Sequence, residues 1–206
     1  MSVETALIAF ALAAALLTIT PGLDTAMVLR TAAVEGPRTA ALAALGIILG
    51  CLAWGAAVAL GLGVLLAASS FAYTVLKWAG AAYLAWLGIK LILQPRSQFD
   101  LGAANGAPRG DWLARGFLNN LLNPKIGVFY VSFLPQFVPT HVPAGPFIFL
   151  LAVIHGLLGA IWFAVLIGAT APLKRWLARR AVVRWIDRIT GVVFVGFGLR
   201  QAFDRR

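Results

Sequence analysis

Three ionisable residues stand inside otherwise apolar stretches of the chain, and each is a candidate for chemistry. Asp24 follows Thr-Pro-Gly-Leu, Lys125 follows Asn-Pro, and His155 precedes a glycine. Charged groups are costly among apolar residues, so they usually pair with each other or mark substrate and proton pathways. A carboxylate can bind an ammonium group or carry a proton, and a lysine can bind a carboxylate. These residues predict a site for a small charged or zwitterionic molecule.

The first group of candidate binding residues surrounds a predicted helix break and comprises Thr20, Pro21, Gly22 and Asp24. Proline costs about 3 kcal/mol in a helix interior, so a new half-helix is expected to begin near Gly22. Its first N–H groups would lack intrahelical partners and attract a carboxylate. Asp24 would bind an ammonium group or carry a proton. The alternative is a kinked helix in which Asp24 lies near the cytoplasmic interface and pairs with Arg30 or a neighbour.

The second group of candidate binding residues comprises Asn123, Pro124 and Lys125. Lys125 is far along the chain from the nearest charges, so its side chain would reach the membrane surface only with strain. It is expected to face the interior of a helix bundle and to meet a carboxylate, either of a ligand or of Asp24. The alternative is a purely structural Asp24–Lys125 pair with no transport role.

Other positions carry weaker signals. His155 is a second candidate, beside Asp24, for proton coupling, although a hydrogen bond to a neighbouring helix would also explain it. Gly46 and Gly50 are four residues apart and predict close helix packing. Cys51, the single cysteine, is expected to be a buried apolar residue. The chain shows no motif of a hydrolytic, nucleotide-binding or metal-dependent enzyme, so neither an enzyme nor a cofactor is expected.

The composition indicates the kind of protein that must position these residues. Of 206 residues, 61% are hydrophobic and 12% are charged, whereas soluble domains carry about a quarter charged residues. Uncharged runs cover 5–23, 39–76 and 126–173, and a membrane helix needs roughly 20 apolar residues. The class predicted is an all-α integral membrane protein. The net charge of +10 is concentrated in short connections that would face anionic lipid, so nucleic-acid binding is not expected.

Six membrane-spanning helices are predicted, at 3–29, 39–68, 71–93, 113–138, 146–173 and 182–203. They form a single transmembrane domain over 1–206, with half-repeats at about 1–93 and 113–206 and a polar cytoplasmic loop at about 94–112. Pro21 and Pro124 each interrupt the first span of a three-span half. An odd number of spans would give the halves opposite orientations, and paired broken helices point to a transporter's binding site. An inverted repeat with a proline-broken first helix in each half is therefore predicted.

The distribution of basic residues predicts the orientation in the membrane. With both termini outside, the connections on the cytoplasmic side hold most of the Lys and Arg residues, as the positive-inside rule requires. The stretch 174–188 is basic and amphipathic, and it is expected to lie along the membrane surface. Its Trp176 and Trp185 would then lie at the level of the lipid headgroups.

Three segments give the chain a family resemblance over its whole length. They are "TPGLD", "GAAYLAWLGIKLI" and "GFLNNLLNPKIGVFYVSFLPQFV", and they resemble the lysine-exporter (LysE/RhtB) family of amino-acid translocators. The resemblance implies a six-span exporter of the bacterial inner membrane that is driven by the proton-motive force and is dimeric. The first candidate group matches the family's first motif and the second group matches its second. Many members have a second proline where this chain has Leu23, which bears on how far the first helix unwinds.

The leading hypothesis is a secondary exporter of amino acids or close derivatives that works by proton antiport. The substrate carboxylate would meet Lys125 and the N–H groups after Pro21, and the ammonium group would meet Asp24 or Asn123. Candidates for the pathway lining are Trp54, Phe129 and Trp162. One alternative is a cation or heavy-metal exporter or channel with Asp24, Cys51 and His155 as ligands, and another is a non-transporting membrane scaffold.

Overall fold

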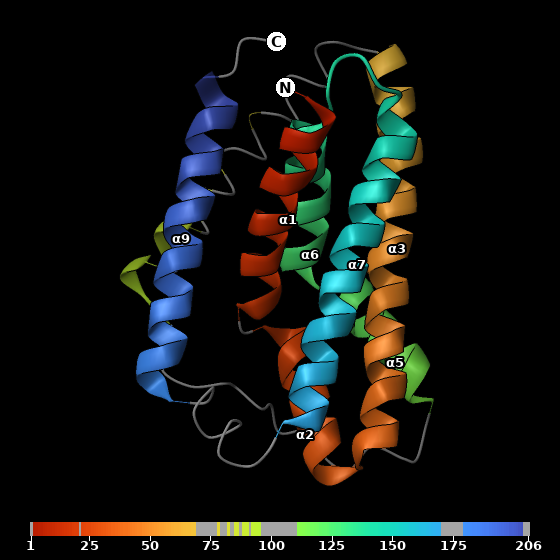
Figure 1. The fold of residues 1–206 in the computed structure, drawn as a ribbon, viewed down its shortest axis with the longest axis vertical. Helices are drawn as coiled ribbons and strands as arrows, with labels where there is room; N and C mark the ends of the chain where they lie inside the picture. Colours follow the sequence, from red (N-terminus) through yellow and green to blue (C-terminus); the bar gives the residue numbers. More distant parts are fainter. Residues whose placement is uncertain are drawn as a thin grey trace.

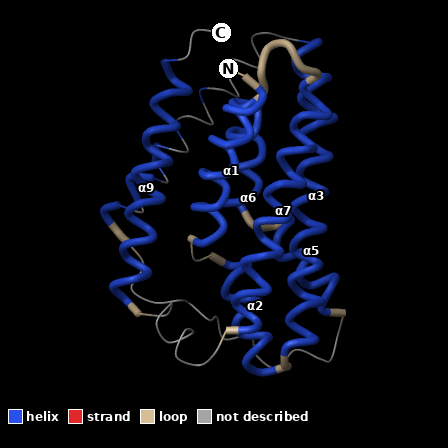
Figure 2. The backbone as a smooth tube through the Cα atoms, viewed as in Figure 1, coloured by secondary structure: helices blue, strands red, loops and turns tan. Residues whose placement is uncertain are grey.

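The computed structural model describes residues 2–20, 22–68, 78, 82, 85–86, 88–90, 92–95, 111–169 and 179–203. These residues form helices without any strand (Figure 2). The α-helices are α1 (Val3–Ile19), α2 (Leu23–Val34), α3 (Pro37–Ala68), α5 (Trp112–Leu121), α6 (Pro124–Val128), α7 (Ala144–Gly168) and α9 (Arg180–Phe203). A π-helix, η1 (Phe129–Phe133), and a 3-10 helix, η2 (Leu134–Phe137), follow α6. The predicted span 71–93 and loop 94–112 lie mostly outside the described residues.

The helices lie side by side along one direction (Figure 1). α1 and α2 together run from one end of the bundle to the other, and α3 returns. The segment from α5 to η2 runs in the same direction as α3, and α7 runs back. α9 lies on the far side of α1 from α3, and the end of α9 lies at the same end of the bundle as the start of α1.

Two of the described helices, Pro37–Gly61 in α3 and all of α7, are long and apolar enough to cross a membrane. The pair α1 and α2 would make a third span, with a bend of 52° between its members. The predicted span 113–138 is divided among α5, α6, η1 and η2, and α9 carries several charged residues near its start. The described helices therefore leave the count of six spans a prediction.

The turn between α2 and α3 is built from two adjacent residues with special backbone properties. Gly36 has a φ of 89°, a left-handed conformation that favours glycine. Pro37 then begins α3, where its fixed φ suits a first helical turn. The second span consequently begins slightly earlier than the predicted 39–68.

Helices α3 and α5 cross at glycine contacts. A Cβ at Gly46 would collide with the Leu113 carbonyl oxygen, and a Cβ at Gly116 would collide with that of Ala43. A Cβ at Gly50 would lie 2.7 Å from Oδ1 of Asn120. The absence of side chains lets the two backbones approach closely, which places the polar side chains of α5 beside α2 and α3.

Aromatic rings fill the centre of the bundle. Phe129 stacks on Phe133 with ring centroids 4.7 Å apart, and Phe10 meets Phe137 edge to face at 5.4 Å. The outer faces of the helices carry exposed large apolar residues, among them Leu12, Leu42 and Ile161. Such faces suit contact with lipid.

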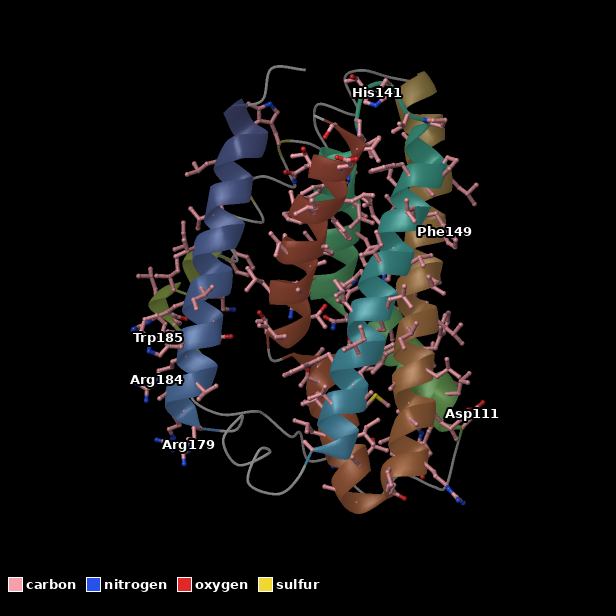
Figure 3. The ribbon with its side chains drawn as sticks, in the orientation of Figure 1. Asp111, His141, Phe149, Arg179, Arg184 and Trp185 are labelled. Atoms are coloured by element: carbon pink, nitrogen blue, oxygen red, sulfur yellow. The ribbon has the colours of Figure 1, made fainter. Side chains whose placement is uncertain are left out.

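The basic stretch 174–188 was predicted to be a separate segment along the membrane surface, and its described part is instead helical. From Arg180 onward it is the first part of α9, and residues 174–178, with Trp176, lie outside the described residues. Figure 3 shows Arg179, Arg184 and Trp185 near the start of α9, at the same end of the bundle as Asp111. Trp185 is 68% exposed, so its ring is available to the surroundings of the bundle.

Candidate functional site

The first helix break separates α1 from α2. Thr20 is the C-cap of α1, and Gly22, in an extended conformation, is the N-cap of α2 without any side-chain capping bond. Pro21 lies outside the described residues. The first N–H groups of α2 have no acceptors within their helix, and they carry the positive end of its dipole. An open helix N-terminus is therefore present where the sequence predicts it, with Asp24 in the first turn.

The second helix break separates α5 from α6. Leu122 and Asn123 form the connection, and the Asn123 side chain accepts a hydrogen bond of 3.1 Å from the backbone N–H of Lys125. Pro124 occupies the first position of α6, where the missing N–H of proline costs nothing. This break is capped, in contrast to the first.

Two asparagines of α5 bind the carboxylate of Asp24. Nδ2 of Asn119 donates to Oδ1 at 2.7 Å, and Nδ2 of Asn120 donates to Oδ2 at 2.9 Å. Asn120 is fully buried, and its Oδ1 has no hydrogen-bond partner among the described residues. Both carboxylate oxygens are thus held from the second half of the chain.

The ammonium group of Lys125 binds the broken end of α1. Its Nζ donates to the carbonyl oxygens of Leu17 at 3.3 Å and Thr20 at 3.2 Å. The last carbonyl groups of a helix lack intrahelical donors and form the negative end of the dipole, so a cation is stabilised there. Gly22 leaves room beside it, because a Cβ at that position would lie 3.4 Å from Nζ. Hydrogen bonds therefore connect the two breaks: Asp24 accepts from α5, and Lys125 donates to α1.

A cavity of about 40 Å³ lies between the two breaks. Its volume suits about three water molecules. The candidate residues that line it are Thr20, Gly22, Asp24, Asn123, Lys125 and His155, together with Cys51. Gly46 and Gly50 lie instead at the contact of α3 with α5, and Pro124 contributes the start of α6. The structure thus gathers residues from distant parts of the chain around one space.

Comparison with known proteins identifies the family. The model of the LysE type translocator matches residues 15–205. The chain belongs to the LysE type translocator family.

Named relatives of this translocator cover nearly its whole length. The Bacillus subtilis protein named "Uncharacterized membrane protein YrhP" is 33% identical over 96% of this chain and 99% of its own. The threonine efflux protein of Salmonella typhimurium is 29% identical, over 90% and 91%. The leucine efflux protein of Enterobacter sp. is 30% identical, over 88% of each chain. No solved structure matches this translocator. The family and the apolar helices together make it a membrane protein whose described residues are helical.

His155 is buried in the translocator's interior. Its Nδ1 shares a hydrogen bond of 3.0 Å with the Tyr130 hydroxyl, and the rings of Phe129 and Tyr130 lie 5.4 Å and 5.6 Å from its own. The imidazole therefore lines the cavity on one side and is held by η1 on the other. The hydrogen bond to Tyr130 is the kind of contact with a neighbouring helix that the sequence analysis gave as the other explanation of His155. The same contact is compatible with proton transfer.

The three residues of the metal hypothesis lie at one cavity. Asp24, Cys51 and His155 line the same cavity, yet no three His, Cys, Asp or Glu side chains among the described residues are grouped closely enough to hold a metal ion. Cys51 is buried and its Sγ accepts a hydrogen bond from Asn120 at 3.4 Å. A thiol so placed behaves as a small, mostly apolar wall residue.

Asn119 and Asn120 were missed by the sequence analysis, although both stand in the quoted segment "GFLNNLLNPK". The available signal was a run of amide side chains inside an apolar segment, where each needs a partner. The three expected lining aromatics, Trp54, Phe129 and Trp162, do not line this cavity. The indole nitrogens of the two tryptophans are buried without a hydrogen-bond partner among the described residues.

Proposed function

We propose that this translocator is a secondary exporter of amino acids or close derivatives. The observation that carries the proposal is a cavity between two helix breaks whose lining includes one carboxylate and one ammonium group. A zwitterionic amino acid presents the complementary pair of charges. The printed names of the relatives, threonine efflux protein and leucine efflux protein, support the same substrate class.

In this proposal, groups of the substrate replace the protein groups that now bind Lys125 and Asp24. Its carboxylate takes the place of the Leu17 and Thr20 carbonyl groups at Lys125 and meets the open first turn of α2. Its ammonium group meets Asp24, with Asn123 beside it at the cavity wall. The cavity has room for about three waters, fewer than the heavy atoms of glycine, so binding requires the breaks to separate.

Proton antiport follows from competition at Asp24. A proton removes the charge that attracts the substrate ammonium group and weakens the two hydrogen bonds from Asn119 and Asn120, because bonds to an ionised acceptor are stronger than those to a neutral one. Substrate and proton then occupy the same carboxylate in turn. His155, hydrogen-bonded to Tyr130 at the cavity wall, is the second group placed to pass a proton.

The proposed membrane arrangement keeps six spans in an inverted repeat within one domain over 1–206. The first predicted span of each half contains a break, and these two broken segments run in opposite directions (Figure 1). In the proposal, both ends of the chain lie outside a bacterial inner membrane; the start of α1 and the end of α9 lie at one end of the bundle, which supports their lying on the same side. Arg38, Arg115 and Arg180 near helix starts at the opposite end fit the positive-inside rule. A homodimer is part of the proposal.

The test is transport by purified protein in vesicles. Threonine and leucine are offered with and without a pH gradient, and wild type is compared with Asp24→Asn. We expect a proton gradient to drive accumulation by the wild type alone, while exchange of labelled for unlabelled substrate in Asp24→Asn becomes insensitive to pH or is lost. Equal, gradient-dependent transport by both proteins would refute the role of Asp24. Failure of a folded, correctly inserted wild type to move any amino acid would favour the scaffold hypothesis.

A further inference from the structure

The part of the cavity wall that bears no charge is formed by α3 and α7. Ile47 and Ile48 come from α3, and Gly156, Gly159 and Phe163 come from α7. A wall of aliphatic, aromatic and backbone atoms suits the side chain of an amino acid whose charged groups are held at the helix breaks. The following inference rests on the proposed function and concerns the kind of side chain that this wall admits.

The two wall glycines are not required by packing. A Cβ at Gly156 would lie 3.4 Å from Cγ2 of Ile48, and one at Gly159 would lie 3.8 Å from Cε2 of Phe163, which are ordinary contact distances. At Gly46, by contrast, a Cβ would collide with backbone atoms of α5. The fold needs glycine at position 46, whereas at positions 156 and 159 glycine leaves space in the cavity.

The two charged side chains of the cavity would both be used by the backbone groups of the amino acid. Among the described residues that line the cavity, Asp24 is the only carboxylate and Lys125 the only ammonium group. The amino acid's own ammonium and carboxylate groups use both of them. A third charge on a lysine or arginine side chain would lie against Ile47, Ile48 and Phe163 without a partner, which is costly in an apolar environment.

We propose that Gly156 and Gly159 set the size limit for the substrate side chain, and that the substrate is a neutral amino acid with an aliphatic or hydroxylated side chain. Alanine, threonine and leucine fit this description. Each added Cβ on α7 shortens the space available, so the larger members of the class are excluded first.

The experiment measures export of alanine, threonine, leucine and lysine from vesicles that contain the full-length protein. The variants are Gly156→Ala, Gly159→Ala and the double variant. The matched control is Gly168→Ala on the same helix, where a Cβ meets nothing within 4 Å. We expect the ratio of leucine to alanine export to fall by about tenfold or more in the double variant, since one methylene group in a tight apolar pocket discriminates by at least that factor. The control keeps the wild-type ratio.

Lysine tests the charge argument separately. Wild type is expected to export lysine about a hundredfold more slowly than leucine, because an unpaired charge in a membrane interior costs about 2.5–3.5 kcal/mol. Comparable rates for lysine and leucine would overturn the neutral-substrate class. An unchanged leucine-to-alanine ratio in a well-inserted double variant would overturn the role of the glycines. Both results leave the exporter proposal standing, whereas absence of export of every amino acid by wild type refutes that proposal and this inference with it.

Discussion

The two helix breaks that border the cavity differ in how their helix starts are satisfied. At the first break, Gly22 precedes α2 without any side-chain cap, and an acidic residue stands in the first turn. At the second break, the Asn123 side chain caps α6 and Pro124 fills its first position. The first break therefore presents free N–H groups, and the second presents a cation on a closed helix start. In the proposed site, the open helix start and the cation would each bind the substrate carboxylate from a different break.

Hydrogen bonds between the two breaks join the first half of the chain to the second. Lys125 from the second break binds the carbonyl end of α1, and Asp24 from the first binds the asparagines of α5. Opening one break must disturb the contacts of the other. In the proposed mechanism, substrate binding would therefore be coupled to helix movement through the same few hydrogen bonds.

The largest effect is expected from removing the cation of the second break. Lys125→Met should reduce export by at least about thirtyfold, because loss of one partner of a buried charged contact costs about 2–5 kcal/mol. Initial efflux rates from preloaded vesicles measure this. The matched control is Lys90→Met, which removes an exposed lysine that lies over the Trp86 ring. Wild-type rates in a correctly inserted Lys125→Met variant would contradict the assignment.

A cap added to the first break should have an intermediate effect. Gly22 is extended, with φ of −159°, so Gly22→Ser is compatible with the backbone. The new hydroxyl would accept a hydrogen bond from the first turn of α2 and compete with the substrate carboxylate. We expect KM to rise about tenfold, the effect of losing one hydrogen bond to a charged group. Gly61→Ser, at a position with open space around a Cβ, is the control, and an unchanged KM in Gly22→Ser would mean that the open helix start binds nothing.

The smallest effect is expected from removing the cap of the second break. Asn123→Ala should lower the free energy of unfolding by about 1 kcal/mol, the usual value of an N-cap. Asn123→Ser should restore most of it, because a hydroxyl can accept the same bond. Thermal unfolding in detergent distinguishes these variants without relying on transport. Equal stability of the alanine and serine variants would show that the capping bond contributes nothing to α6.

The sequence was informative about the site where single residues have strong physical preferences. Proline next to glycine or asparagine, with one charge nearby, predicted both breaks, and the structure places Gly22, Asp24, Asn123 and Lys125 around one cavity. The partners of the charges were not predictable, because Asn119 and Asn120 reach Asp24 only through the packing of α5 against α2 and α3. The division of the span 113–138 into four short helices also escaped prediction, since hydropathy does not register a change from α to π or 3-10 geometry.

The most direct test of the central claim uses the single cysteine of the chain. Cys51 is buried in the cavity wall with Asp24 and Lys125, so a small methanethiosulfonate reagent reaches it only when the breaks separate, and the reaction reports on that space in the unmodified protein. Saturating leucine or threonine is expected to slow the labelling of Cys51 in wild-type membranes, and the protection is expected to disappear in Lys125→Met. If labelling proceeds at the same rate with and without these amino acids while the same preparation exports them, the cavity between the two breaks is not the substrate site.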